Sequence, residues 1–208
     1  MCFSPEASFV ASGVLATAGA AIAQKQIPKQ ERFLASLPIF FAIQQFFEGV
    51  VWLYLYEAGP MLAIGIYGFN AFALLFWPIA VPIAMGQVET DPLRKKLIHL
   101  TLVAGLIAGA FYLFNTVTQG IGVRLEQQCL QYQVFLPWQI GLLYWAGANG
   151  ALLLSSNPWW VASGLMVALG AFIAFIAFPF AIASVWCYFA ASISLVLVLY
   201  YFQKKSRK

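Results

Sequence analysis

The residues with the clearest chemical potential are two amides and a carboxyl group inside an apolar run. Gln44, Gln45 and Glu48 interrupt the otherwise hydrophobic stretch 33–56. Residues four apart share one face of a helix, so Gln44, Glu48 and Trp52 form a stripe with Gln45 beside it. An acidic side chain at the centre of a membrane helix costs about 2.5 to 3.5 kcal/mol, and it normally turns toward a bundle interior or a wet cavity. We therefore predict a polar binding site around this stripe.

The next apolar run adds an amide and an indole to the candidate site. Asn70 and Trp77 lie in this run, and Pro78 and Pro82 predict a kink or local unwinding just after them. The charge state of a carboxyl among amides can change when a ligand binds. We predict that the chain binds or translocates a small molecule or ion, with Glu48 as the charge-bearing or proton-exchanging group and a pocket that opens toward the external face. The candidate binding residues are Gln44, Gln45, Glu48, Trp52, Asn70 and Trp77.

Two other interpretations of these residues stay open. In the first, the chain is an intramembrane enzyme or a thiol or metal redox protein that uses Cys2 with Glu6 or Glu48. In the second, it is a structural or assembly subunit without a pocket, and Glu48 serves packing alone. No cofactor is identified, and if a metal binds, we expect Cys2 and Glu6 among its ligands. The sequence does not decide whether the protein is an enzyme.

The three cysteines fall near one face of the predicted bundle. Cys2 precedes the first apolar run, Cys129 lies in a polar connection, and Cys187 opens the last run. We predict that Cys129 and Cys187 approach closely enough for a disulfide, which requires Cα atoms within about 7 Å. Cys2 is then the thiol most accessible to reagents.

Composition restricts the chain to one class of protein. Of its 208 residues, 62% are hydrophobic and 9% charged, and the mean hydropathy is +0.84, whereas soluble domains are about 25% charged. This predicts one all-α integral membrane domain, residues 1–208, with a bundle of seven transmembrane helices. The predicted spans are 8–23, 33–56, 61–85, 97–117, 138–154, 161–178 and 184–202.

The basic residues predict orientation rather than a nucleic-acid partner. The net charge is +4, but ten of the eleven basic residues flank the spans on one side of a seven-span bundle, and only Arg124 falls on the other. Because basic loops stay in the cytoplasm, we predict a cytoplasmic C-terminus and an external N-terminus in the inner (plasma) membrane. The expected partners are the lipid bilayer and a small ligand; the oligomeric state stays open.

Three separated motifs resemble those of a known group of proteins. They are Met1-Cys2-Phe3-Ser4, then Gln44-Gln45-x-x-Glu48-Gly49-x-x-Trp52, and then Trp77-Pro78-x-x-x-Pro82. The chain thereby resembles a family of uncharacterised bacterial multi-pass membrane proteins that begin with a Met-Cys-Phe-Ser motif. Many members carry a histidine-containing segment in the long external connection, where this chain has Glu126-Gln127-Gln128-Cys129. The resemblance implies no activity.

Overall fold

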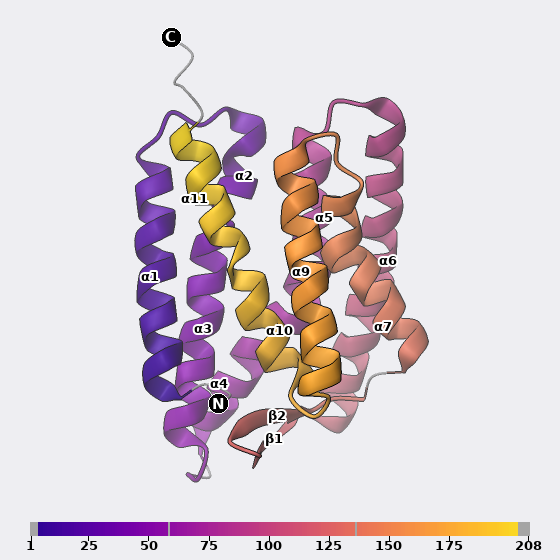
Figure 1. Cartoon of the computed structure of the whole chain (residues 1–208). Helices are drawn as coiled ribbons and strands as arrows, with labels where there is room; N and C mark the ends of the chain where they lie inside the picture. Colours follow the sequence, from indigo (N-terminus) through magenta and orange to yellow (C-terminus); the bar gives the residue numbers. More distant parts are fainter. Residues whose placement is uncertain (1–3, 58, 136, 204–208) are drawn as a thin grey trace.

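The structure, a computed structural model, is a bundle of helices closed at one end by a β-hairpin (Figure 1). It describes residues 4–57, 59–135 and 137–203. Within these ranges the chain forms seven helical segments that run up and down side by side (Figure 1). The hairpin lies at the opposite end of the bundle from the last helical turn of the chain.

Several of the seven segments contain a break or a change of helix type. The first is α1 (Pro5–Ala23), and the second joins the 3₁₀ turn η1 (Lys29–Glu31) to α2 (Arg32–Ala35) and α3 (Leu37–Tyr54). The third joins α4 (Pro60–Asn70), the π-helix η2 (Ala71–Phe76) and α5 (Trp77–Val88), and the fourth is α6 (Pro92–Gln119). The fifth joins α7 (Trp138–Trp145), the π-helix η3 (Ala146–Gly150) and α8 (Ala151–Leu153). The sixth is α9 (Pro158–Ala177), and the seventh joins α10 (Ile182–Ala191) and α11 (Ile193–Gln203).

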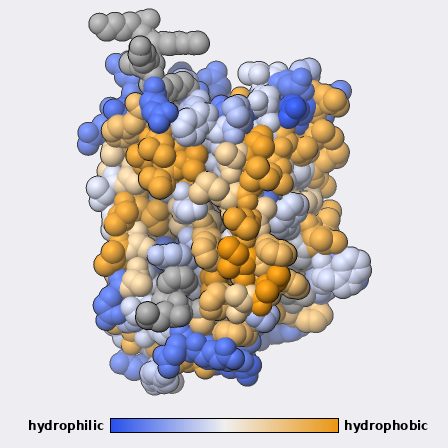
Figure 2. Space-filling view, viewed as in Figure 1, coloured by the Kyte–Doolittle hydropathy of each residue, from blue (hydrophilic) through white to orange (hydrophobic). Residues whose placement is uncertain are grey.

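Six of these segments are long and apolar enough to cross a membrane. The fifth, 138–153, is shorter, roughly 24 Å at 1.5 Å per residue. The surface has the pattern of a membrane-spanning bundle. A hydrophobic band covers its body, and hydrophilic residues gather at both ends (Figure 2). The chain therefore has the features of a multi-pass membrane protein with seven helices, of which six have full spanning length.

Helix starts follow local sequence signals. Proline stands in the first turn of four helices that begin after a loop, α1, α4, α6 and α9, where the missing N–H would have no partner anyway. Three side chains cap the following backbone: Ser4 accepts from Ala7, Asp91 from Arg94, and Asn157 from Trp159. These signals fix where the helices begin but not which faces they present to one another.

The third segment is distorted where its prolines withhold backbone donors. Trp77 N–H donates to Phe72 O across the π-helix, and Pro78 has no N–H to give, so Ala73 O is left for another donor. The hydroxyl of Tyr144 donates to that carbonyl. The distortion is a π-helix in the middle of the segment, earlier than the kink or unwinding that we predicted near its end, and Pro82 remains inside α5.

A close helix contact forms one turn further along α5. Pro82 withholds the N–H that Pro78 O would normally accept, and this carbonyl faces glycines of two other helices. A Cβ added at Gly105 would lie 1.8 Å from Pro78 O, and one added at Gly147 would lie 2.6 Å from it. A Cβ added at Gly109, four residues after Gly105, would meet only the ends of two side chains, at 3.4 and 3.9 Å. The close approach thus depends on Gly105 and Gly147.

The polar connection after α6 is an antiparallel hairpin, which we did not predict. Strand β1 (Gly122–Glu126) pairs with β2 (Cys129–Gln133), with Glu126 opposite Cys129. The two turn residues, Gln127 and Gln128, have φ of 48° and 63°. Positive φ at both positions matches the twist of a two-residue hairpin turn, but it is unusual for residues other than glycine or asparagine. Strand β2 packs against α10 and so covers the interior of the bundle at this end.

Candidate functional site

Glu48 lies in the middle of α3 and is completely buried, with 0% of its surface exposed. Gln45 Nε2, one turn away, donates to Glu48 Oε2 at 3.1 Å. The hydroxyl of Ser184, at the start of α10, donates to Glu48 Oε1. Both partners are neutral, and no ion pair within the described ranges involves Glu48. The carboxyl group thus joins α3 to α10 without a compensating positive charge.

A second hydrogen bond ties the same helix to α5. Trp77 Nε1 donates to Gln44 Oε1 at 2.6 Å, and the indole stacks on Phe41 with ring centroids 3.8 Å apart. The thiol of Cys187, also on α10, lies beside the side chain of Gln44. The prediction that Gln44, Gln45, Glu48 and Trp77 share one buried region is consistent with these contacts, although Gln45 rather than Gln44 bonds to Glu48.

Tyr132 of β2 brings the hairpin against this region. Its ring stacks on Phe69 with centroids 4.6 Å apart, and its hydroxyl is close enough to Glu48 and Cys187 to interact with them electrostatically. Only 9% of the Tyr132 surface is exposed. Tyr132 therefore lies at the end of the bundle toward which we expected the pocket to open. We call the whole group the Glu48 cluster: Gln44, Gln45, Glu48, Trp77, Tyr132, Ser184 and Cys187.

Several buried polar atoms in and near the Glu48 cluster have no hydrogen-bond partner in the described part of the chain. Within the cluster they are Gln44 Nε2, Gln45 Oε1 and the hydroxyl of Tyr132. Native proteins pair nearly all buried polar groups, so such atoms indicate a water, ion or ligand. The same is true of four more amide and indole atoms in the described bundle: Trp52 Nε1, Asn70 Oδ1 and both polar atoms of the Asn149 side chain.

The two remaining predicted binding residues lie at the edge of this arrangement. Trp52 is half-buried and packs against the apolar residues around Phe69 and Tyr132. Asn70 is buried and donates to Ile66 O of its own helix at 2.8 Å. Sequence reasoning missed Ser184 and Tyr132. A serine inside an apolar run was a visible signal for the first, but nothing marked the tyrosine.

The cysteines correct one prediction. Cys129 is disulfide-bonded while Cys187 is free and buried, so the expected pairing of these two residues is wrong. The two lie in adjacent layers, since β2 packs on α10, but Cys187 points to the Glu48 cluster. Cys2 lies outside the described residues, and so does the partner of Cys129.

The metal hypothesis gains no support from the described residues. Glu6 is exposed in the first turn of α1. No group of three or more histidine, cysteine or acidic residues within the described ranges could hold a metal ion.

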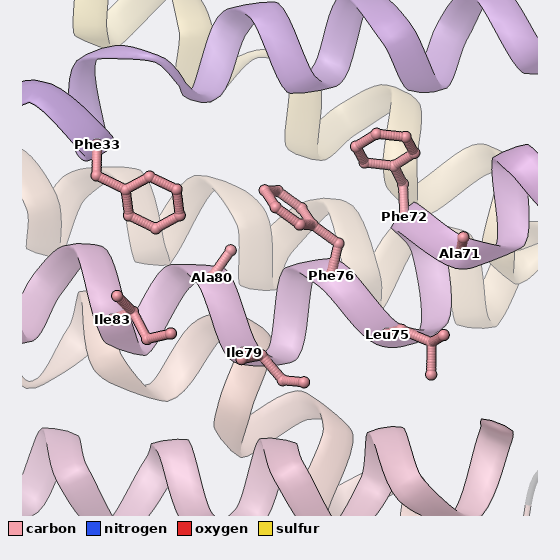
Figure 3. Close-up of a pocket in the computed structure, with 8 residues that line it drawn as sticks. All are labelled: Phe33, Ala71, Phe72, Leu75, Phe76, Ile79, Ala80 and Ile83. Carbon is pink, nitrogen blue, oxygen red and sulfur yellow. The ribbon is translucent and has the colours of Figure 1, made fainter.

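Two hollows differ sharply in their relation to the Glu48 cluster. The groove in Figure 3, about 410 Å³, is lined entirely by apolar side chains, among them Phe33, Phe72 and Phe76, and by no member of the cluster. A cavity of about 30 Å³ touches the cluster at Trp77 and Cys187. Its other walls are mostly apolar, for example Phe41, Val81 and Leu152. Neither of these two hollows is lined by Glu48, Gln45 or Ser184.

A second buried carboxylate, Glu89, lies at the opposite end of the bundle, just after α5. It accepts from backbone and hydroxyl donors of two loops, 89–91 and 154–157. Burial by itself would raise the pKa of this carboxyl, but the N–H groups of Ser156, Asp91 and Thr90 and the Ser156 hydroxyl lower it to about 2. Arg94 adds hydrogen bonds to Leu154 O and Ser155 O, both at 3.0 Å. Glu89 thus fastens two loops together.

Fold and site together describe a helical bundle that has the features of a multi-pass membrane protein and a buried polar cluster around one carboxyl group. The chain belongs to the Family of unknown function (DUF6629), which matches residues 1–208. This agrees with the expected membership of an uncharacterised family. No curated protein and no solved structure gives a significant match.

Proposed function

We propose that this protein binds a proton or a small cation at Glu48 and carries it across a membrane. The observation that carries the proposal is the state of Glu48: complete burial, two neutral donors and no ion pair within the described ranges. An acidic residue inside a membrane is costly, and such residues mark ion pathways and proton relays. A proton or cation at Glu48 would supply the missing positive charge.

The neighbouring atoms suit a hard cation. Gln45 Oε1 and the Tyr132 hydroxyl are buried oxygens without a partner in the described chain, and the Glu48 carboxylate and Ser184 hydroxyl lie in the same cluster. Carboxylate, carbonyl and hydroxyl oxygens are the ligands that such ions prefer.

Insertion and orientation are part of the same proposal. Lys25, Lys29, Arg32 and the basic cluster after Asp91 lie at the end of the bundle where α11 finishes, and Arg124 lies in the hairpin at the other end (Figure 1). Basic loops favour the cytoplasmic side, so this arrangement supports a cytoplasmic C-terminus in a bacterial inner membrane. The hairpin would then cover the external entrance to the Glu48 cluster.

Thermal unfolding of the purified protein tests the proposal. Melting temperatures are measured at pH 5 to 9 in sodium, potassium and choline chloride of equal ionic strength, for wild type, Glu48→Gln and Glu57→Gln. A cation at 100 times its dissociation constant stabilises by about 2.7 kcal/mol, or roughly 5 to 10 °C for a chain of this size. We expect such a shift, or a pH dependence, in wild type and in Glu57→Gln, whose carboxyl is exposed, and its loss in Glu48→Gln.

The alternatives give different results in the same preparation. A packing subunit predicts a wild-type melting temperature that varies with neither cation nor pH and is matched by Glu48→Gln. A thiol or metal enzyme predicts bound metal, or reactive thiol, in stoichiometric amount. Either result would replace ion binding as the function.

A further inference from the structure

A pocket at the basic end of the bundle has features of a lipid site that is separate from the Glu48 cluster. It measures about 630 Å³ and lies between α1, the loop that follows it, α2 and the start of α3. Gly19, Ile22 and Ile39 form walls toward the body of the bundle, and Lys25, Gln26 and Arg32 line the part at its end. The pocket is thus apolar toward the middle of the membrane and basic at its edge.

Both cations of this pocket are available to an anion. No ion pair within the described ranges involves Lys25 or Arg32, and both side chains are exposed. Lys25 Nζ lies 3.8 Å from the ring centroid of Phe202 in the last turn of α11, which holds the ammonium group at the rim. The acidic neighbour Glu31 is not among the residues that line the pocket.

We propose that this pocket binds the headgroup of an anionic phospholipid from the surrounding bilayer, with the phosphate between Lys25 and Arg32. The charge of the rim complements a phosphate group, and basic pockets between membrane helices recognise anionic headgroups. The apolar walls at Gly19 and Ile39 complement the first part of an acyl chain, which a soluble phosphate does not have. The absence of a side chain at Gly19 lets Ile39 pack directly against α1, because an added Cβ would lie 2.4 Å from Ile39 Cδ1.

The test compares two double variants that remove the same charge from the same end of the bundle. Lys25→Gln with Arg32→Gln changes the pocket, whereas Lys95→Gln with Lys96→Gln changes two lysines of α6 that do not line it. Delipidated full-length protein is titrated with phosphatidylglycerol, and native mass spectrometry gives the dissociation constant of the first bound lipid. Each basic residue near a membrane surface contributes about fivefold, so the pocket variant should bind about 30-fold more weakly, while the α6 variant should match wild type.

Other ligands identify the source of the phosphate. Phosphatidylcholine should bind more weakly than phosphatidylglycerol to wild type, and millimolar inorganic phosphate should not displace the bound lipid. Displacement by phosphate would overturn the lipid as the occupant. Equal weakening in both double variants would also overturn the proposal, since it indicates diffuse attraction to a basic surface. Arg32→Gln alone makes the same comparison with about a fivefold effect if the double variant is not recovered.

Discussion

Two buried carboxylates, Glu48 and Glu89, lie at different depths of the bundle and differ in how many hydrogen-bond donors surround them. Glu48 accepts two hydrogen bonds from described side chains and has unpartnered polar atoms nearby. Glu89, 4% exposed, accepts five within the described ranges. Its donors are the N–H groups of Thr90, Asp91 and Ser156 and the hydroxyls of Ser155 and Ser156.

The difference separates a structural carboxylate from a candidate for function. The donors around Glu89 satisfy its charge and fix its position, so any ligand would have to displace a complete set of bonds. Glu48 has fewer donors, and buried oxygens such as Gln45 Oε1 remain free to accept a cation or water. Burial alone therefore does not mark an active carboxyl; incomplete satisfaction by the protein does.

Removal of the Glu89 carboxylate should have the largest effect. Glu89→Ala leaves the donors of both loops without their acceptor, and we expect a loss of about 3 kcal/mol in the free energy of unfolding, because these loops can partly rehydrate. Glu57→Ala, at an exposed position, is the control and should stay within about 0.5 kcal/mol of wild type. Denaturant unfolding in a mild detergent measures both. If Glu89→Ala is as stable as the control, the hydrogen bonds of Glu89 do not hold the two loops together as we infer.

Acidification tests the same carboxylate without mutation. The pKa of Glu89 lies near 2 in the folded protein, below the ordinary value of 4.5. Its stabilising contribution is therefore complete above pH 4.5 and is lost as the pH falls toward 2. We expect Glu89→Gln to abolish this part of the acid sensitivity and to leave the stability profile between pH 5 and 9 unchanged. If Glu89→Gln altered the stability between pH 5 and 9, the low pKa assigned to Glu89 would be wrong. Stability in that pH range would then no longer report on Glu48 alone.

Gly105→Ala tests whether the Glu48 cluster and the loops around Glu89 both depend on the close contact between Gly105 and Pro78. The new Cβ would lie 1.8 Å from Pro78 O in α5, the helix that carries Trp77 of the Glu48 cluster and ends just before Glu89. Overpacking of this kind costs about 1 to 3 kcal/mol. Gly109→Ala, with space at its position, should be nearly neutral. Equal melting temperatures for the two variants would show that the contact at Pro78 is not needed.

Ser184→Ala should have a smaller effect confined to the Glu48 cluster. It removes the hydroxyl that donates to Glu48 Oε1, at a cost of about 1 kcal/mol. Ser194→Ala is the matched control, because Ser194 lies further along the same segment and its buried hydroxyl has no partner in the described chain. We expect Ser184→Ala also to weaken the cation- or pH-dependent shift, and Ser194→Ala to retain it. A cation response unchanged in Ser184→Ala would place the ion elsewhere.

The smallest expected effect is on thiol accessibility, with no change in stability. Cys187 is buried beside Gln44, so N-ethylmaleimide should modify it slowly in the folded protein. The peptide that contains Cys129 should appear disulfide-linked in a non-reducing digest, and the peptide that contains Cys187 should not. Slower modification of Cys187 in the presence of the bound cation would indicate that occupancy closes the cluster further. Rapid modification in all conditions would contradict an occluded site.

The sequence was sufficient for the class of protein, the number of helical segments and the polar focus on α3. Composition and run length decide these, because few other arrangements can bury so much apolar surface. The spacing of Gln44, Gln45 and Glu48 also predicted one buried group, since a carboxyl group in a membrane helix must turn inward. Helix starts were marked locally by prolines such as Pro92 and caps such as Asp91.

Only the tertiary structure decided which residues complete the site. Ser184 meets Glu48 across 136 residues of sequence, and the local pattern of α10 does not show which other helix the Ser184 side chain will contact. Tyr132 reaches the cluster through a hairpin whose turn residues, Gln127 and Gln128, are poor turn formers. The sequence gives no sign of the role of Glu89, because three of its five described donors come from a second loop more than sixty residues away. Contacts between distant segments depend on helix rotation and packing, which a local pattern does not encode.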